Sequence, residues 1–339
     1  MTKPLIAIPM GDPAGVGPEI VLKTVASSWI RETARCLIIG DARVLERAMG
    51  YPGSPRLSLR AVSKPGDCDW SADGVVHLID LANINMDAFV PGTISGMCGK
   101  AAYEYIELSA RLAMEGAVDA VATPPINKES FREGNVPYIG HTEVFADLSG
   151  VPDPLTLFQT RTLRIFFLTR HIPLSQVSLS VTYERLMDYG RRCWSALRRM
   201  GVTEGCMAIA GLNPHSGEHG LFGDEEERVV RPAVEALRAE GFAVEGPVSA
   251  DSVFSLALRG DYNSVLSLYH DQGHIAAKTL DFERTVSITA GMPFLRTSVD
   301  HGTAFDIAGK GVADETSMCE AIRVAALYAS AYREASTRS

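Results

Sequence analysis

Short apolar runs rich in Ile, Val and Leu alternate along the chain with longer segments of helical period. The runs do not alternate polar with apolar positions, so we expect strands that are buried on both faces, as in a mainly parallel sheet covered by helices. The pattern predicts strands at 5–9, 36–39, 75–79, 118–122, 163–168, 207–210, 265–269 and 286–289, and helices near 18–28, 43–49, 99–115, 183–200, 225–240 and 315–334.

The connections between these segments are short. Only residues 51–74, with several Pro, Gly and Asp residues, predict irregular surface structure, and they carry no evident chemistry. The chain has no internal repeat and no long flexible linker, so any domain boundary must pass through short connections. A protein divided by a cleft is therefore expected, not separate domains on a tether.

Composition narrows the class of protein. The 339 residues are 46% hydrophobic and 22% charged, which is typical of a large globular protein with one or two domains. The net charge of −9 argues against a nucleic-acid partner. No apolar stretch is long enough for a membrane span, and the composition of residues 1–13 leads us to expect no secretory leader. Six cysteines without a C-x-x-C spacing are expected to be reduced thiols, and we expect a cytoplasmic protein.

A glycine-rich segment at 11–19 (GDPAGVGPE) follows the first predicted strand and precedes a helix. Backbone N–H groups in such a loop can bind an anion or a cofactor. The glycines at 11, 15 and 17 do not match the G-x-G-x-x-G dinucleotide fingerprint, so a tight structural turn is an equal alternative.

Three histidines follow predicted strands: His171, His215 and His270. Strand ends are where α/β proteins bind ligands, and three imidazoles could hold one divalent ion with positions open for substrate. Hydrogen-bonded histidines without a metal remain an alternative. A zincin pair of His270 and His274 is rejected, because Asp271 stands where that motif needs Glu.

The remaining candidate functional residues are two cations and an acidic loop. Lys278 and Arg296 lie in apolar or small-residue stretches, and a phosphate or carboxylate ligand would suit both cations; an internal salt bridge or a solvent-facing side chain is the alternative for each. Residues 301–311 supply small residues and backbone donors, and Asp306 could accept both hydroxyls of an adenosine ribose, which would favour NAD over NADP. A turn-capping role for Asp306 is the alternative.

Taken together, several strings resemble the 4-hydroxythreonine-4-phosphate dehydrogenase family of pyridoxal-phosphate biosynthesis along essentially the whole chain. They are residues 11–19, 140–143, 211–215, 269–273 and 296–304. The resemblance implies an α/β fold like that of isocitrate and isopropylmalate dehydrogenases. Two α/β/α subdomains with a mainly parallel sheet would flank a central active-site cleft, one formed by 1–130 with 290–339 and the other by 131–289.

The resemblance also assigns roles to individual residues. It implies a homodimer with the active site at the interface, bound NAD, and one divalent ion, with zinc preferred and magnesium and cobalt as alternatives. The implied metal ligands are His171, His215 and His270; the substrate-binding residues are His141, Thr142, Lys278, Ser287 and Arg296; the catalytic candidates are Lys278 and Asp251; and the cofactor-binding residues are His301, Gly302, Thr303, Ala304 and Asp306. Asp271 and Lys128 are weaker candidates for orienting and proton-transfer roles.

The implied reaction is the NAD- and metal-dependent oxidation of 4-(phosphooxy)-threonine to a β-keto acid, which loses carbon dioxide to give 3-amino-2-oxopropyl phosphate. Ser287 replaces an expected Asn and His274 an apolar residue, so the alternative is a subgroup that oxidises 4-phospho-D-threonate or 4-phospho-D-erythronate. In either case the partner is a small phosphorylated four-carbon hydroxy acid. A metal-dependent hydrolase or lyase and a non-catalytic phosphate sensor are the competing classes.

Overall fold

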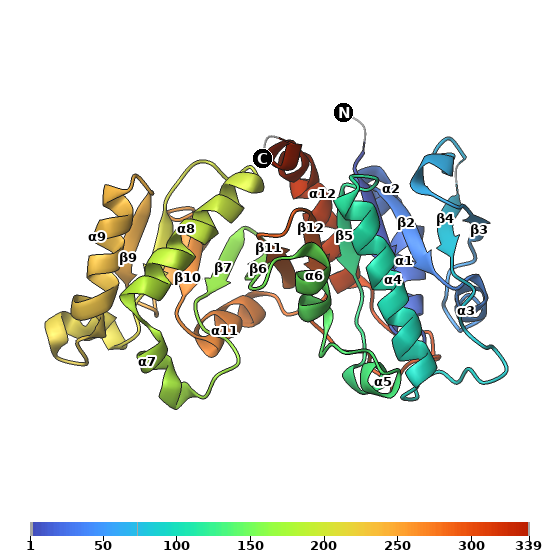
Figure 1. The fold of residues 1–339 in the computed structure, drawn as a ribbon, viewed down its shortest axis with the longest axis horizontal. Helices are drawn as coiled ribbons and strands as arrows, with labels where there is room; N and C mark the ends of the chain where they lie inside the picture. Colours follow the sequence, from blue (N-terminus) through green and yellow to red (C-terminus); the bar gives the residue numbers. More distant parts are fainter. Residues whose placement is uncertain (1–2, 73, 338–339) are drawn as a thin grey trace. The chain divides into compact units, whose positions relative to one another are not determined.

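The computed structural model describes residues 3–72 and 74–337. The chain divides into two compact units, Met1–Pro154 with Met292–Ser339, and Leu155–Gly291, called unit 1 and unit 2 (Figure 1). Residues 131–154, which the sequence analysis grouped with the second subdomain, fall in unit 1. No helix in the described part of the chain is long and apolar enough to cross a membrane.

Unit 1 contains a parallel sheet whose strands lie in the order β3-β4-β2-β1-β5-β12. Its central strands are almost wholly buried, as their unbroken apolar sequences predict. Figure 1 shows α4 in front of these strands and α12 behind them. The strands are β1 (Leu5–Pro9), β2 (Arg35–Gly40), β3 (Ser58–Ala61), β4 (Val75–Asp80), β5 (Ala120–Thr123) and β12 (Leu295–Ser298).

The helices of unit 1 begin with recognisable signals. Pro18 stands in the first turn of α1, and the Ser95 hydroxyl accepts from the backbone N–H of Cys98 at the start of α4. The helices are α1 (Gly17–Ala26), α2 (Ser28–Thr33), α3 (Ala42–Ala48), α4 (Gly96–Met114), α5 (Lys128–Glu133), α6 (His141–Ser149) and α12 (Thr316–Thr337).

Unit 2 contains strands in the order β11-β6-β7-β10-β8-β9. The last four are parallel, whereas β6 pairs antiparallel with both β7 and β11. Its core packs Phe158, Ile165 and Val265 against the apolar faces of α10 and α11. The elements are β6 (Leu155–Thr160), β7 (Leu163–Phe167), α7 (Val177–Ser180), α8 (Tyr183–Arg199), β8 (Met207–Ala210), α9 (Arg231–Ala239), β9 (Val244–Val248), α10 (Val253–Arg259), β10 (Ser264–Ser267), α11 (His270–Leu280) and β11 (Val286–Ala290).

The mainly parallel α/β fold is confirmed, and all eight predicted strands are present with ends shifted by up to a few residues. The prediction of irregular structure throughout 51–74 is wrong, because β3 lies within it; this strand is mostly exposed and has no buried apolar run to reveal it. Three further strands, β6, β9 and β12, and six helices, α2, α5, α6, α7, α10 and α11, were not predicted. All six cysteines are free thiols.

Candidate active site

Arg296 is the centre of a buried cationic site in unit 1. It projects from β12, is 3% exposed, and donates through Nε and Nη2 to the hydroxyl of Thr123 at 3.1 and 2.6 Å. Its guanidinium carbon lies 5.4 Å from the centre of the Phe145 ring. Burial lowers the pKa of Arg296 to about 9, so the group remains a cation at neutral pH and attracts an anion.

The first turn of α6 provides the second part of this site. His141 is the first residue of α6, and its ring is nearly parallel to that of Phe145, with centroids 6.3 Å apart. Burial, and after it the charge of Arg296, holds the pKa of His141 well below its usual value, so the imidazole is neutral. Its buried Nε2 has no hydrogen-bond partner among the described residues. With Thr142 and the N–H groups of the helix start, these residues are suited to bind a phosphate.

The glycine-rich segment packs directly against the predicted cofactor residues. The N–H of Val16 donates to the carbonyl of Thr303 at 3.0 Å, and a Cβ on Gly15 would lie 2.9 Å from the Thr303 side chain. A Cβ on Gly17 would meet the Met10 carbonyl at 2.4 Å. These glycines therefore permit close packing of the backbone, which favours the tight-turn interpretation of residues 11–19.

Asp12 is buried inside the same segment. One of its oxygens accepts from the Ala14 N–H at 2.9 Å, and the other has no partner among the described residues. Burial raises the pKa of Asp12 to about 6. The segment thus holds a carboxyl group that is costly to ionise.

Two residues of α1 hold the loop after the predicted cofactor residues. The buried Glu19 accepts from the Gly309 N–H at 2.6 Å, and Lys23 donates to the carbonyls of Gly311 and Ala313 at 3.0 and 2.5 Å. Asp306 lies in this loop with an exposed carboxylate that contacts no hydrogen-bond or ion-pair partner within the described chain. It is therefore available to accept the two hydroxyls of a ribose.

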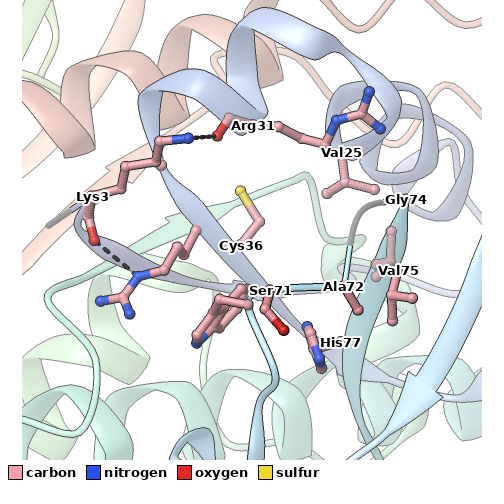
Figure 2. Close-up of a pocket in the computed structure, with 13 residues that line it drawn as sticks. Lys3, Val25, Arg31, Cys36, Ser71, Ala72, Gly74, Val75 and His77 are labelled. Carbon is pink, nitrogen blue, oxygen red and sulfur yellow. Dashed lines mark hydrogen bonds between the residues drawn. The ribbon is translucent and has the colours of Figure 1, made fainter.

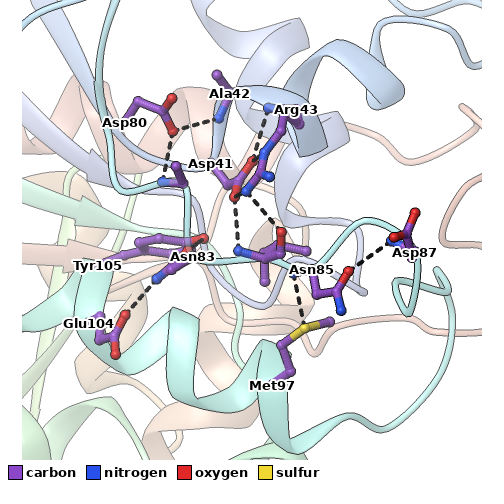
Figure 3. A network of polar contacts seen from close by, with 12 residues as sticks. Asp41, Ala42, Arg43, Asp80, Asn83, Asn85, Asp87, Met97, Glu104 and Tyr105 are labelled. Carbon is purple, nitrogen blue, oxygen red and sulfur yellow. Dashed lines mark hydrogen bonds and ion pairs between the residues drawn. The ribbon is translucent and has the colours of Figure 1, made fainter.

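A polar network fixes the segment after β4 beside these loops (Figure 3). The buried carboxylate of Asp41 accepts from the Ile84 N–H at 2.9 Å and from Arg43 at 2.7 Å. Burial alone would raise the pKa of Asp41, but these hydrogen bonds lower it below its usual value. Further along the segment, the Gly92 N–H donates to the Ala14 carbonyl at 2.7 Å and so connects this segment to the glycine-rich segment.

In unit 2 the structure brings two of the three predicted metal ligands together. His270 begins α11, His171 lies in the segment after β7, and their ring centroids are 5.9 Å apart. Both line a pocket of about 270 Å³ with Arg170 and Tyr269. Nδ1 of His270 lies 2.6 Å from a carboxylate oxygen of Asp271, an arrangement that orients a ligand imidazole and leaves Nε2 free for a metal.

The third histidine, His215, lies in an unusual loop after β8. Residues 215–219 are all left-handed, with φ from 43° to 79°, a conformation that four of the five, being non-glycine, rarely adopt. The buried Glu226 accepts from the N–H groups of Leu212 and Asn213 at 2.8 and 2.7 Å. Such strain often accompanies functional sites when surrounding contacts impose it.

Gln272 connects the strand ends that carry His215 and His270. Its amide donates to the Gly211 carbonyl at 2.8 Å, and its oxygen accepts from the Leu268 N–H at 2.7 Å. Even so, the described residues contain no group of three or more His, Cys, Asp or Glu side chains that could hold a metal ion. The donor chemistry of His171 and His270 fits a divalent ion.

The remaining predicted residues are distributed over both units. Lys278 lies on α11 and lines a pocket of about 380 Å³ with His270 and His274, whose rings stack at 3.7 Å. Ser287 is half-buried on β11 opposite Phe158. The catalytic candidate Asp251, between β9 and α10, and the weaker candidate Lys128, at the start of α5, are both exposed outside the pockets described here.

Sequence reasoning missed four residues that shape these sites: Thr123, Phe145, Glu226 and Gln272. Gln272 lies within the string at 269–273 that carried the resemblance, and Thr123 ends a predicted strand region, so both had a local signal. Phe145 and Glu226 had none, because their roles depend on contacts between distant segments.

Comparison with known proteins agrees with this geometry. The family model described as "Pyridoxal phosphate biosynthetic protein PdxA" matches residues 32–325. A curated protein of Clostridium botulinum, named "Putative D-threonate 4-phosphate dehydrogenase", is 57% identical over 332 residues, covering 98% of this chain and 99% of the relative.

Two solved structures are also similar over nearly the whole chain. The 4-hydroxythreonine-4-phosphate dehydrogenase of Klebsiella pneumoniae is 40% identical with a TM-score of 0.91, covering 97% of this chain and 98% of that one. The enzyme of the same name from Burkholderia phymatum is 41% identical with a TM-score of 0.87, covering 97% and 99%. The resemblance predicted from the sequence is confirmed: this oxidoreductase belongs to the PdxA family.

Proposed function

We propose that this chain is an NAD-dependent dehydrogenase that oxidises the C3 alcohol of D-threonate 4-phosphate. The observation that carries the proposal is the buried cation Arg296 beside the first turn of α6, a site built for a phosphate group. Relatives named for D-threonate 4-phosphate are 55–57% identical to the chain, whereas solved structures named for 4-hydroxythreonine 4-phosphate are 38–41% identical.

The face of α11 supports the choice between these two substrates. D-threonate 4-phosphate carries a hydroxyl at C2, where 4-hydroxythreonine 4-phosphate carries an ammonium. His274 lies on this face with His270 and Lys278, and it stands where the 4-hydroxythreonine 4-phosphate enzymes carry an apolar residue. This departure, together with the higher identity to the relatives named for D-threonate 4-phosphate, supports the acid without the amine as the substrate.

The cofactor and metal assignments follow from the donor groups. We assign NAD to the loop of His301, Gly302, Thr303, Ala304 and Asp306, because the exposed Asp306 carboxylate can accept ribose hydroxyls and repels a 2′-phosphate. We assign one divalent ion, with zinc preferred by imidazole ligands, to His171 and His270 with His215 as the third ligand. When bound, NAD accepts the hydride and the ion stabilises negative charge on the substrate oxygen.

The chain's own residues orient the substrate for this transfer. Arg296, His141 and Thr142 bind the terminal phosphate, so binding energy is used to fix the position of C3. In unit 2, Asp271 holds His270 in one orientation. The oxidised product is a β-keto acid, which loses carbon dioxide and leaves a three-carbon hydroxyketone phosphate.

A homodimer would complete the site. Unit 2 exposes a set of large apolar side chains around the histidine pockets, which a second copy of the chain would cover. Since the described part of one chain gathers no three-ligand group, ligands from the partner subunit would supply the missing coordination. The exposed side chains are Leu174, Leu179, Leu221, Phe222, Ile275 and Phe282. We place the enzyme in the cytoplasm, because its six cysteines are free thiols.

The direct test compares three substrates with the purified enzyme and NAD: D-threonate 4-phosphate, D-erythronate 4-phosphate and 4-hydroxythreonine 4-phosphate. NADH formation is measured by absorbance, with zinc added and with chelator. We expect kcat/KM for D-threonate 4-phosphate to exceed that for the amino substrate at least tenfold. A preference for the amino substrate would contradict the choice, and turnover without NAD would indicate a hydrolase or lyase instead.

A further inference from the structure

A large pocket in unit 1 lies apart from the predicted cofactor loops. Its volume is about 520 Å³, and its lining includes Lys3, Arg35 and Cys36 at the start of β1 and β2 (Figure 2). The predicted cofactor loops instead follow the opposite ends of β1 and β12. A strand of five residues is about 16 Å long, so the pocket and these loops are separate places in the same unit.

Three cations surround the pocket: Lys3, Arg31 and Arg35. Lys3 donates to the Arg31 carbonyl at 2.7 Å, and Nε of Arg35 donates to the Lys3 carbonyl at 2.9 Å, so these residues are linked through the backbone. Among the described residues that line the pocket there is no carboxylate. The Asp69 carboxylate lies next to this lining and accepts from the backbone N–H and the hydroxyl of Ser71 at 3.1 and 2.6 Å, which leaves the three cations for a ligand.

An aromatic surface lies beside these cations. The guanidinium carbon of Arg35 is 5.5 Å from the centre of the Trp70 ring, and the Trp70 and His77 ring centroids are 4.7 Å apart. Trp70 is 36% exposed, so part of the indole remains accessible to a ligand. A planar ring can stack on such a surface.

His77 adds an unused hydrogen-bond donor. It is only 1% exposed, and its Nε2 accepts from the Asp69 N–H at 3.2 Å, which places the imidazole proton on Nδ1. Nδ1 is buried and has no partner in the described part of the chain. An unsatisfied buried donor destabilises the folded protein, and a ligand acceptor would remove that penalty.

We propose that this pocket binds a planar aromatic anion, meaning an aromatic ring that carries a carboxylate, sulfonate or phosphate. The ring stacks on Trp70, the acidic group lies among Lys3, Arg31 and Arg35, and His77 donates to a ligand acceptor. Neither an uncharged ring nor a small inorganic anion uses all of these groups. The site does not depend on the proposed dehydrogenase reaction.

The test titrates the full-length enzyme with naphthalene-2-sulfonate by isothermal calorimetry. We expect saturable one-site binding, with at least tenfold weaker binding of 2-naphthol, which lacks the charge, and of methanesulfonate, which lacks the ring. Trp70→Ala and Arg35→Met should each raise Kd at least tenfold. The matched controls, Trp29→Ala on α2 and Arg259→Met on α10, should leave Kd within twofold.

A second measurement uses the unaltered protein and needs no variant to fold. Figure 2 shows the Cys36 thiol pointing from β2 toward the middle of the lining residues. Saturating naphthalene-2-sulfonate should therefore slow the modification of Cys36 by a methanethiosulfonate reagent at least fivefold, measured by mass spectrometry, while Cys206 in unit 2 is unaffected. Unchanged Cys36 labelling, or Kd values equal for Trp70→Ala and Trp29→Ala, would overturn the proposal.

Discussion

The two units present their candidate chemistry in opposite ways. In unit 1, Arg296, His141 and the glycine-rich segment are buried or half-buried, and backbone hydrogen bonds fix the loops around them. In unit 2, His171 and His215 are exposed, and the pockets beside His270 are open. One unit therefore holds a binding site that is already organised, whereas the other holds ligands that need a metal ion and a second subunit to become organised.

This difference assigns separate tasks to the two units. A rigid cation site selects a phosphate and fixes its position, because its groups need little reorganisation on binding. The exposed imidazoles of unit 2, by contrast, contribute to the reaction only when they hold a metal ion. Substitutions in unit 2 should therefore remove metal and turnover together, and substitutions in unit 1 should change affinity and specificity.

The largest effect is expected from His270→Ala. Loss of one imidazole ligand should lower kcat/KM by about 10³-fold, because metal stabilisation of the substrate oxygen contributes several kcal/mol. Bound zinc, measured by plasma mass spectrometry, should fall in parallel. His219→Ala, a change at an exposed histidine in the His215 loop, is the control and should keep both values within twofold. Full activity of His270→Ala would contradict the assignment of His270 as a metal ligand.

Arg296→Met should have the next largest effect. Loss of a buried, charge-assisted contact to phosphate costs about 3 kcal/mol, so KM for the phosphorylated substrate should rise by about 100-fold. KM for NAD should change less than threefold, and Arg284→Met, at an exposed arginine, should change neither. Equal increases in both constants would place Arg296 outside the phosphate site.

Asp306→Ser tests the cofactor assignment in unit 1. Removal of the carboxylate should reduce the preference for NAD over NADP by about tenfold, because the 2′-phosphate is no longer repelled. The ratio of kcat/KM for the two cofactors measures this preference. Asp67→Ser, at another exposed acid in unit 1, should leave the ratio unchanged. An unchanged ratio in Asp306→Ser would show that Asp306 does not bind the ribose.

The smallest effect concerns stability and Asp12. Its pKa of about 6 lies above the usual value near 3.9, so the folded state holds this proton more tightly than the unfolded chain does. The stability that this proton contributes is present below pH 4 and is lost as the pH rises through 6, by about 2–3 kcal/mol. Asp12→Asn should flatten this dependence in urea unfolding between pH 4 and 7.5. Parallel curves for the two proteins would contradict it.

How much could be predicted from sequence depended on whether the signal was local. Strands such as β1 and β5 were found because they are buried on both faces and read as continuous apolar runs. By contrast, β12 was missed because its sequence LRTS is polar although the strand is buried. The helix α11 was missed because His270, Asp271 and Gly273 give it a weak helical pattern.

The same distinction between local signals and long-range contacts applies to the candidate site. The strand-end histidines could be predicted because they follow apolar runs, and the cations Lys278 and Arg296 because they lie in apolar or small-residue stretches. The packing of both His141 and Arg296 against Phe145 was not, because 155 positions separate His141 from Arg296 and only the folded chain brings them together. The left-handed backbone at 215–219 also has no sequence signal, since four of its five residues are not glycine.

That left-handed segment has a consequence for anyone who engineers this enzyme. Four non-glycine residues in this conformation cost about 1 kcal/mol or more each, so glycine at Ser216 or Glu218 would raise the melting temperature. A glycine in this loop would also allow the His215 imidazole to move over a wider range of positions. A glycine substitution that raises the melting temperature at this loop should therefore lower the turnover rate.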